Sequence, residues 1–335
     1  MAGPAHWLWG CAAWALTSIF GLGCNDASLS SGGGASGSPE PGASATGNPN
    51  AAALSSASPV SIQEDSLKSP SNPLGLPPVR IKLSPGKRVF AVSGEMLARA
   101  RAGSTFVFYA ATVVGFEGDD LLIEGKTGPN YKVHPAYVIA APDDPKIRVG
   151  DPIITEYTGV MKHAIVNKIM PGRILVRYTD VDARAPEGYL KPKETSIIPQ
   201  INGLQSGNYA AWREGDIYRH VLLISSIMVN NTKQWLVLGY AGAAHVVPES
   251  ALTAIPVKLK VKEGESVWAE SVGILRRATV QNADTPGFFT VKYERAGRPV
   301  TLGLGFVSLP LENAGGTTPN TGGSKANSKD RNELR

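Results

Sequence analysis

Regularly spaced glycine and proline residues limit what this chain can fold into more than any other feature of its sequence. The glycines are separated by 64, 57 and 57 residues: Gly86, Gly150, Gly207 and Gly264. The prolines are separated by 57, 57 and 54 residues: Pro142, Pro199, Pro256 and Pro310. Two independent markers share one period, which indicates an internal repeat. Four copies of so short a unit predict four small separate cores in place of one large core.

The second copy, residues 150–199, shows what each unit is made of. Ile153, Thr155 and Tyr157 alternate with their neighbours as in a short strand, and the MPG segment at 170–172 is typical of a hairpin turn. Five short strands fit within about fifty residues, which is too few for a sandwich but enough for a small closed barrel. The same order of glycine, strands and turns recurs in the other copies.

The sequence therefore predicts an all-β fold of four tandem five-stranded barrels. Their expected boundaries are residues 81–143, 144–200, 201–257 and 258–312. The first unit is longer because of an insert at residues 94–103, in which helix-forming residues lie between two glycines. This insert predicts one or two helical turns.

The second to fourth copies share a pattern that resembles the Tudor and agenet modules of the SH3-like barrel group. The pattern is a glycine, a β run, a turn, a strand with Ala or Val at alternate positions, and a strand ending in tyrosine, and LVRYTD in the second copy is the closest segment. The resemblance implies Tudor-like barrels, in which an aromatic cage binds a methylated side chain. The matching ligand-binding candidates are Tyr157, Tyr178, Tyr189, Tyr240 and Tyr293.

Only the second copy has the residues for a complete cage. The first copy has Gly125 where the others are expected to have tyrosine, and the fourth has Ser271 in the place of Tyr157. The alternative is that each tyrosine caps a barrel core with its ring and leaves its hydroxyl in water. Recognition of methylated side chains also fits poorly with an exported protein.

The first 23 residues predict export. They form an apolar leader without Lys, Arg, Asp or Glu, and they are followed by Cys24 and a polar tract. This arrangement resembles the lipobox of bacterial lipoproteins, which implies that Cys24 is lipidated and that the protein lies at the outer membrane. An ordinary signal peptide cut nearby and an uncleaved anchor are the alternatives. Residues 24–80, rich in Ser, Gly and Pro, predict a disordered tether, and residues 313–335 predict a disordered tail.

Charge and reactive residues predict no catalysis. The formal net charge of +5 is scattered and allows a weak attraction to anionic lipid, polysaccharide or nucleic acid. Cys11 and Cys24 are the only cysteines, and no catalytic or phosphate-binding motif occurs. His163 and His220 occupy equivalent places, which predicts a polar position on the barrel exterior. We therefore expect no catalytic residue, no metal site and no cofactor.

The functional expectation is a non-enzymatic exported lipoprotein whose modules bind or scaffold an unknown partner in the cell envelope. Binding to peptidoglycan or another polysaccharide is the first alternative. Binding of nucleic acid or another anionic surface through the basic units is the second, and nucleic acid is the less expected of these partners.

Overall fold

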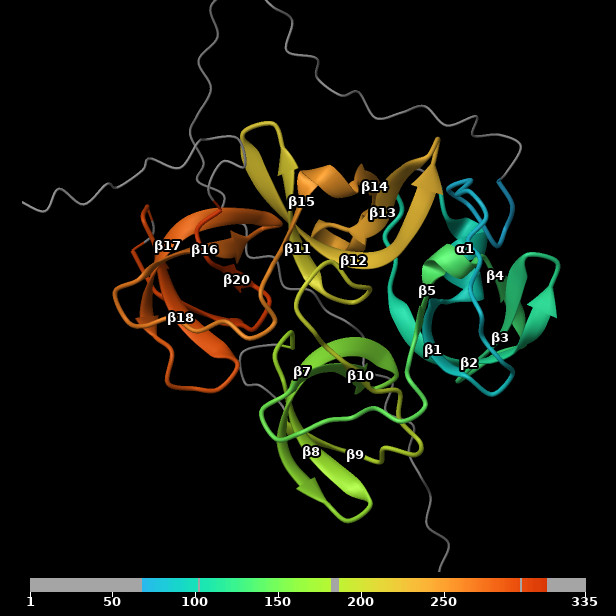
Figure 1. Cartoon of the computed structure of the whole chain (residues 1–335), viewed down its shortest axis with the longest axis horizontal. Helices are drawn as coiled ribbons and strands as arrows, with labels where there is room; N and C mark the ends of the chain where they lie inside the picture. The colour runs from blue at the N-terminus through green and yellow to red at the C-terminus, as the bar shows by residue number, and fades with distance from the viewer. Residues whose placement is uncertain (1–67, 102, 182–186, 296, 312–335) are drawn as a thin grey trace, which may run out of the picture. The chain divides into compact units, whose positions relative to one another are not determined.

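The structure is a computed structural model that describes residues 68–311 except 102, 182–186 and 296. The described chain is all-β, as predicted, and its strands form two antiparallel sheets of ten strands each (Figure 1). No helix among the described residues is long and apolar enough to cross a lipid bilayer. The predicted leader, Cys24, the tether up to residue 67 and the tail lie outside the described residues.

Each sheet contains two sets of five strands that follow each other along the chain. The first set is β1 (Arg88–Val92), β2 (Phe108–Glu117), β3 (Asp120–Gly125), β4 (Tyr131–Val133) and β5 (Val138–Ala140). The second set is β6 (Pro152–Tyr157), β7 (Val160–Met170), β8 (Arg173–Tyr178), β9 (Glu187–Leu190) and β10 (Ile198–Pro199). The third set is β11 (Tyr209–Glu214), β12 (Ile217–Val229), β13 (Thr232–Leu238), β14 (Ala244–Pro248) and β15 (Leu252–Ala254). The fourth set is β16 (Ser266–Ser271), β17 (Ile274–Asn282), β18 (Phe288–Tyr293), β19 (Val300–Gly303) and β20 (Val307–Ser308).

The four sets share one pairing order. The first strand pairs with the second and fifth, the second with the third, and the third with the fourth. The predicted insert at residues 94–103 contains the short helix α1 (Gly94–Arg99), and the side chain of Ser93 caps its N-terminus. Three 3₁₀ turns also lie between strands: η1 (Pro135–Tyr137), η2 (Tyr240–Gly242) and η3 (Glu249–Ala251).

The repeated glycines begin each set with the same turn. Their φ angles lie between +83° and +86°, a left-handed backbone that glycine adopts without a steric cost. Each glycine N–H donates to a carbonyl of the second strand, at 2.7 to 2.9 Å, and a β-bulge follows each acceptor residue. The acceptors are Val113, Val166, Leu223 and Val280. This shared turn explains why the glycine spacing was visible in the sequence.

The predicted closure of each unit into a barrel is not found in the strand pairing. Among the described residues, the fourth strand of each set pairs with the third alone, and the fifth pairs with the first alone, so the sheets are open. The fifth strands have two or three residues and offer few backbone groups for a further pairing.

Neighbouring sets are joined where their second strands touch. Tyr109 of β2 pairs with Val160 of β7, and Arg219 of β12 pairs with Ile274 of β17. Beside each pair, one N–H donates across the junction at 2.9 Å, from Ala110 to the Gly159 carbonyl and from His220 to the Gly273 carbonyl. The second junction therefore repeats the first.

The expected division into four separate cores holds only in part, since the second, third and fourth sets each have a cluster made wholly or almost wholly of their own residues. The largest cluster of buried side chains combines Phe90 of the first set with Ile154 of the second and Ile227 of the third. The long strand β12 causes this, because its far half packs beside η1, where the Ser225 hydroxyl donates to the Ala136 carbonyl at 2.8 Å. Burial is therefore shared between sets.

The predicted tether, residues 24–80, ends too late in the sequence, because residues near its end pack on the first set. Leu76 is 1% exposed in the largest core cluster, and its N–H donates to Asn72 Oδ1 at 2.9 Å. The Leu74 N–H donates to the hydroxyl of Tyr137 at 3.2 Å. The prolines around these residues suggest a flexible segment, but the two leucines contribute enough apolar surface to hold it on the first set.

Candidate functional site

A cavity of about 430 Å³ lies where the four strand sets meet. Each set contributes to its wall: Phe106 and Phe108 from the first, His163 and Asp180 from the second, Tyr209 and His220 from the third, and Glu270 and Phe306 from the fourth. A site of this kind exists only when all the sets pack together.

Aromatic rings from three sets stack beside the cavity. The Tyr209 ring lies between His163 and His220, with centroid distances of 4.4 and 4.6 Å. Phe306 packs on Tyr209 at 5.1 Å and on His220 at 4.9 Å. These contacts form an aromatic cluster, partly stacked and partly tilted, in the wall of the cavity.

The two histidines are not on the exterior, which corrects the sequence-based prediction. His163 is 3% exposed and His220 is 7% exposed. Both lie on the second strand of their set at the place where another set covers it. The side of a strand that would face water in an isolated barrel is an interface in this protein.

His163 is held by hydrogen bonds at both ring nitrogens. Its Nε2 lies 2.8 Å from the carbonyl oxygen of Gly207, so Nε2 must carry a hydrogen. Its Nδ1 lies 2.9 Å from Asp180 Oδ2 and 3.1 Å from the Tyr209 hydroxyl. These contacts fix the orientation of the His163 ring between the second and third sets.

The other carboxyl oxygen of Asp180 has no hydrogen-bond partner among the described residues, which leave out residues 182–186. The Asp180 side chain is 9% exposed, and its Oδ1 is buried without a hydrogen bond. A buried carboxyl oxygen without a hydrogen bond costs about 1–3 kcal/mol relative to a hydrogen-bonded one. Asp180 is also one of the residues that line the cavity.

The protonation of the neighbouring rings follows from their burial. His220 Nε2 donates to the Gly305 carbonyl at 2.9 Å, and burial, helped by the nearby His163, lowers the pKa of His220 to about 4. Burial raises the pKa of Tyr209 well above its usual range, followed by the effect of Asp180. His220 and Tyr209 are therefore neutral at pH 7. Among the described residues, no three metal-binding side chains gather closely enough to hold a metal ion.

The three tyrosines expected to form a cage in the second set are not brought together. Tyr157 and Tyr178 are in contact, with ring centroids 5.0 Å apart. The Tyr178 hydroxyl donates to the Glu156 carbonyl at 2.8 Å. Tyr189 is 61% exposed and lies on the opposite face of β9, since the adjacent Gly188 is the residue that faces Tyr178.

Tyr293 of the fourth set repeats the structural role of Tyr178. Its hydroxyl donates to the carbonyl of Glu270, the counterpart of Glu156. Burial, followed by the adjacent glutamate, raises the pKa of Tyr178 and of Tyr293 to about 12. Both hydroxyls thus bind backbone within their own set, not water as the capping alternative expected.

Tyr240 is not the counterpart of Tyr178. Leu222 pairs with Leu238, so the residue that corresponds to Tyr178 is Gly239, and Tyr240 lies one residue further on, in η2. A shift of one residue turns a side chain to the other face of a strand. Tyr240 is 60% exposed, and it is the one predicted tyrosine that lines the cavity.

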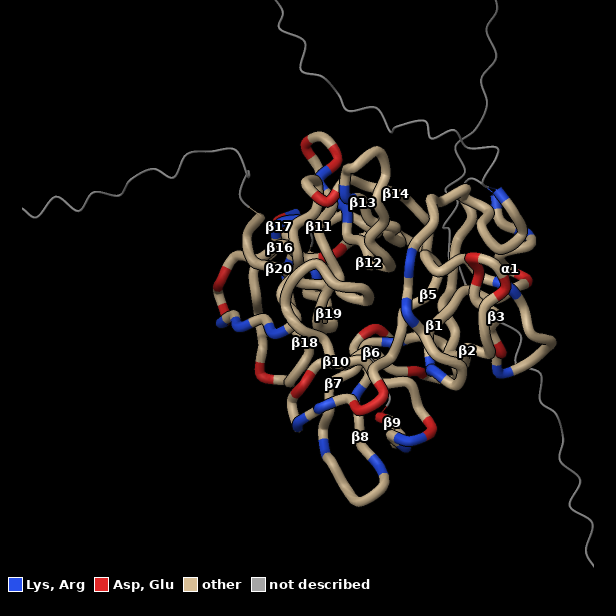
Figure 2. The backbone as a smooth tube through the Cα atoms, turned by 45° about the vertical axis from the view of Figure 1, so that its right-hand side comes forward, with Lys and Arg blue, Asp and Glu red and all other residues tan. Residues whose placement is uncertain are grey.

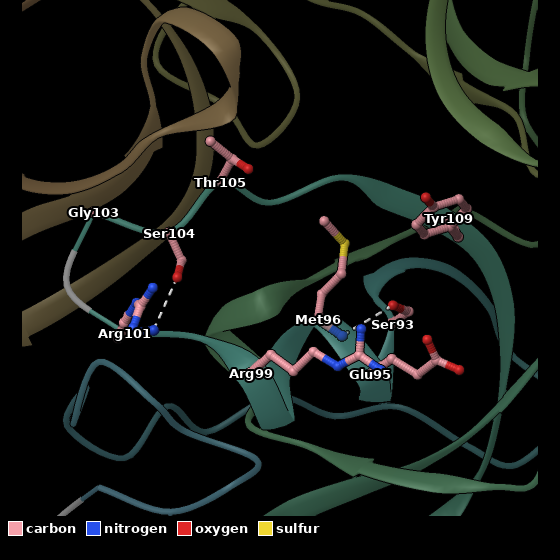
Figure 3. A pocket seen from close by; sticks show the side chains of 9 residues that line it. All are labelled: Ser93, Glu95, Met96, Arg99, Arg101, Gly103, Ser104, Thr105 and Tyr109. Carbon is pink, nitrogen blue, oxygen red and sulfur yellow. Dashed lines mark hydrogen bonds between the residues drawn. The ribbon is translucent and has the colours of Figure 1, made fainter. Parts of the chain in front are cut away.

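A second hollow, of about 560 Å³, lies beside α1 (Figure 3). The serine hydroxyls that line it form hydrogen bonds with nearby backbone: Ser93 accepts from the Met96 N–H and Ser104 accepts from the Arg101 N–H. None of its lining residues holds a buried polar atom without a partner. The cavity between the four sets is therefore the better candidate.

No protein-family model matches the chain, and no curated protein is similar to it in sequence. Function therefore has to be inferred from the geometry of the described residues. Sequence reasoning missed Asp180, Tyr209 and Phe306 as site residues. The recurrence of histidine at His163 and His220 was the one sign of the site, and it could be interpreted only with the contacts between sets.

Proposed function

We propose that this protein is a binding protein whose cavity between the four strand sets holds a small organic molecule or a side chain of a partner. The observation that carries the proposal is that the carboxyl groups of Asp180 and Glu270 line one cavity together with the rings of Tyr209 and Phe306. The ligand supplies an N–H or O–H group to these carboxyl groups.

The chemistry of the wall narrows the ligand class. The volume of about 430 Å³ lies within the range of small-molecule sites. Two carboxyl groups, of Asp180 and Glu270, and the rings of Tyr209 and Phe306 line the cavity. An amine, guanidine or amide group attached to a flat or apolar body is complementary to this combination.

The bonding of His163 supports binding without catalysis. A catalytic histidine uses one nitrogen toward an orienting carboxylate and the other toward the reacting group. In this protein the nitrogen opposite Asp180 is already occupied by the Gly207 carbonyl. His163 therefore has no free nitrogen with which to move a substrate proton.

At the level of the fold, each strand set is an SH3-like barrel with incomplete pairing along one seam. The support is the common pairing order, in which the fifth strand returns to the first, together with the common glycine turn. These barrels act as a scaffold that brings four surfaces to one cavity.

The protein acts in the cell envelope and is anchored there by lipid on Cys24. This part of the proposal is supported by the apolar leader and the lipobox-like sequence around Cys24. Metabolic labelling with a palmitate analogue tests it: the label should be lost on Cys24→Ala. Sedimentation with purified peptidoglycan then separates the alternatives, since enrichment in the pellet would favour a cell-wall ligand over a soluble one.

Ligand-observed NMR with a fragment library of amines, guanidines, amides and neutral hydrocarbons tests the cavity. Donor-bearing fragments should bind, and Asp180→Asn should weaken them about tenfold or more, since a hydrogen bond to a charged group contributes about 1.5–3 kcal/mol. Asp216→Asn, at an exposed hairpin, is the control and should change nothing. Equal binding to both variants would refute the proposal.

A further inference from the structure

The turn between β7 and β8 presents apolar side chains to water. Ile169 is 46% exposed, and Met170 and Pro171 follow it at the tip. An exposed aliphatic group at a hairpin tip contributes nothing to the core of its own set. Such groups commonly mark a surface that contacts another body.

Cations surround this tip. Ile169 and Met170 line a groove of about 800 Å³ whose charged residues are five cations and two carboxylates. The cations are Arg88, Lys146, Arg148, Arg173 and Lys193, and the carboxylates are Asp143 and Asp144. Figure 2 shows the tan turn of the hairpin with basic positions on both of its strands.

Several of these cations are not neutralised. Arg173 and Lys193 are exposed, as is Lys168 at the end of β7, and none of these three forms an ion pair with a described residue. The guanidinium of Arg173 lies over the ring of the exposed Tyr189, 4.9 Å from its centroid. The tip therefore combines aliphatic groups, an aromatic ring and unpaired positive charge.

The equivalent hairpin of the first set has the opposite charge. Phe116 occupies the place of Ile169 and is 47% exposed, but Glu117, Asp119 and Asp120 surround the turn. The two hairpins share their backbone position and their apolar exposure. They differ in the sign of the charge, which makes the first an internal control for the second.

We propose that the β7–β8 hairpin tip docks on an anionic lipid bilayer surface, with Ile169 and Met170 entering the interface and the surrounding cations facing lipid headgroups. Apolar burial and attraction to anionic lipid together are what interfacial binding requires, and tyrosine favours the same depth. A soluble polyanion would use the cations but would give Ile169 no partner. This docking is independent of the ligand in the cavity.

A fluorophore placed at the tip tests the proposal. The chain contains only Cys11 and Cys24, so a variant with both changed to Ser and with Ile169→Cys carries one label, an environment-sensitive dye. Its emission should shift to the blue with vesicles that contain phosphatidylglycerol. It should not shift with pure phosphatidylcholine, and raised salt should reverse the shift.

The matched control carries the same dye at Phe116→Cys and should give no shift with either vesicle. Because the leader is common to both labelled chains, its own binding cannot produce a difference between them. Arg173→Ala and Lys193→Ala should each weaken the response about fivefold, as expected for one basic residue at an anionic surface. No shift at position 169, an equal shift at position 116, or the same shift with heparin in place of vesicles would overturn the proposal.

Discussion

Val272 has a left-handed backbone, with φ of 52°, in the turn between β16 and β17. Such a two-residue turn needs positive φ at both central positions, and Gly273 supplies the second. A β-branched residue is strained in this conformation, because its Cβ approaches the following carbonyl.

Val272→Asn should therefore raise the free energy of unfolding by about 1 kcal/mol, since asparagine adopts this conformation more readily. Urea denaturation measures the change. Val149→Asn is the control, because Val149 is similarly exposed, at 62% against 66%, but does not have positive φ. Equal effects of the two substitutions would show that side-chain polarity, not strain, determines the result.

His220 makes the stability of the protein depend on pH. Burial lowers its pKa to about 4 in the folded protein, below the usual value for histidine of about 6.5, so the unfolded chain binds a proton more readily. The contribution is complete above pH 6.5 and is lost as the pH falls from 6.5 to 4, to a total of about 3 kcal/mol.

His220→Gln should reduce the loss of stability between pH 7 and pH 4, because the amide does not titrate and can still donate to the Gly305 carbonyl. Urea melts at several pH values measure the difference. The same substitution at His245, which is exposed, should have a smaller effect, although burial also lowers the pKa of that ring. An unchanged pH dependence in His220→Gln would exclude this histidine as the cause.

Strand order and turns were the predictable part of the structure, because local chemistry determines them. Gly86 and its three counterparts were visible in the sequence since no other residue adopts their φ without a steric cost. The contacts between sets were not predictable. A polar residue such as His163 on the outer face of a strand has the same pattern whether it meets water or another set.

The first set has Gly125 where the second has Tyr178, and the pairing of the third and fourth strands gives the physical reason. In the second set the Tyr178 ring covers Gly188 of the neighbouring strand. In the first set the arrangement is reversed, and Tyr131 of β4 covers Gly125. A large and a small residue therefore occupy facing strands in either order. Sequence comparison of one strand at a time could not detect this exchange.

Close approach between elements makes some glycines essential. A Cβ atom on Gly303 of β19 would lie 1.7 Å from the Thr179 carbonyl oxygen, which belongs to another set. Gly303→Ala should therefore separate the second and fourth sets and destabilise the protein by roughly 2 kcal/mol or more. Gly115→Ala is the control, since nothing lies within 4 Å of its Cβ position. Thermal unfolding of the two variants distinguishes them, and similar midpoints would show that the contact adapts without cost.

Because the largest core cluster spans several sets, a core substitution in one set should destabilise another set as well. Ile227 belongs to the third set and is 2% exposed. It lies in the cluster that contains the core of the first set. Ile227→Ala should cost about 2–5 kcal/mol and increase amide hydrogen exchange in β1 and β5 as well as in β12.

Val176→Ala provides the comparison, because Val176 is buried in a cluster made of second-set residues. Its effect on exchange should be strongest within the second set. If Ile227→Ala left the first set unchanged, the sets would be energetically independent in spite of their contact.

The repeated junction has a consequence for the history of the chain. The first and third sets share a glycine at or just after the end of the third strand and a 3₁₀ turn before the fifth, while the second and fourth share the tyrosine whose hydroxyl binds a glutamate carbonyl. Each odd set meets the next even one through the same pair of strands. The chain therefore repeats a two-set unit, and duplication of such a unit would leave this alternation in the sequence.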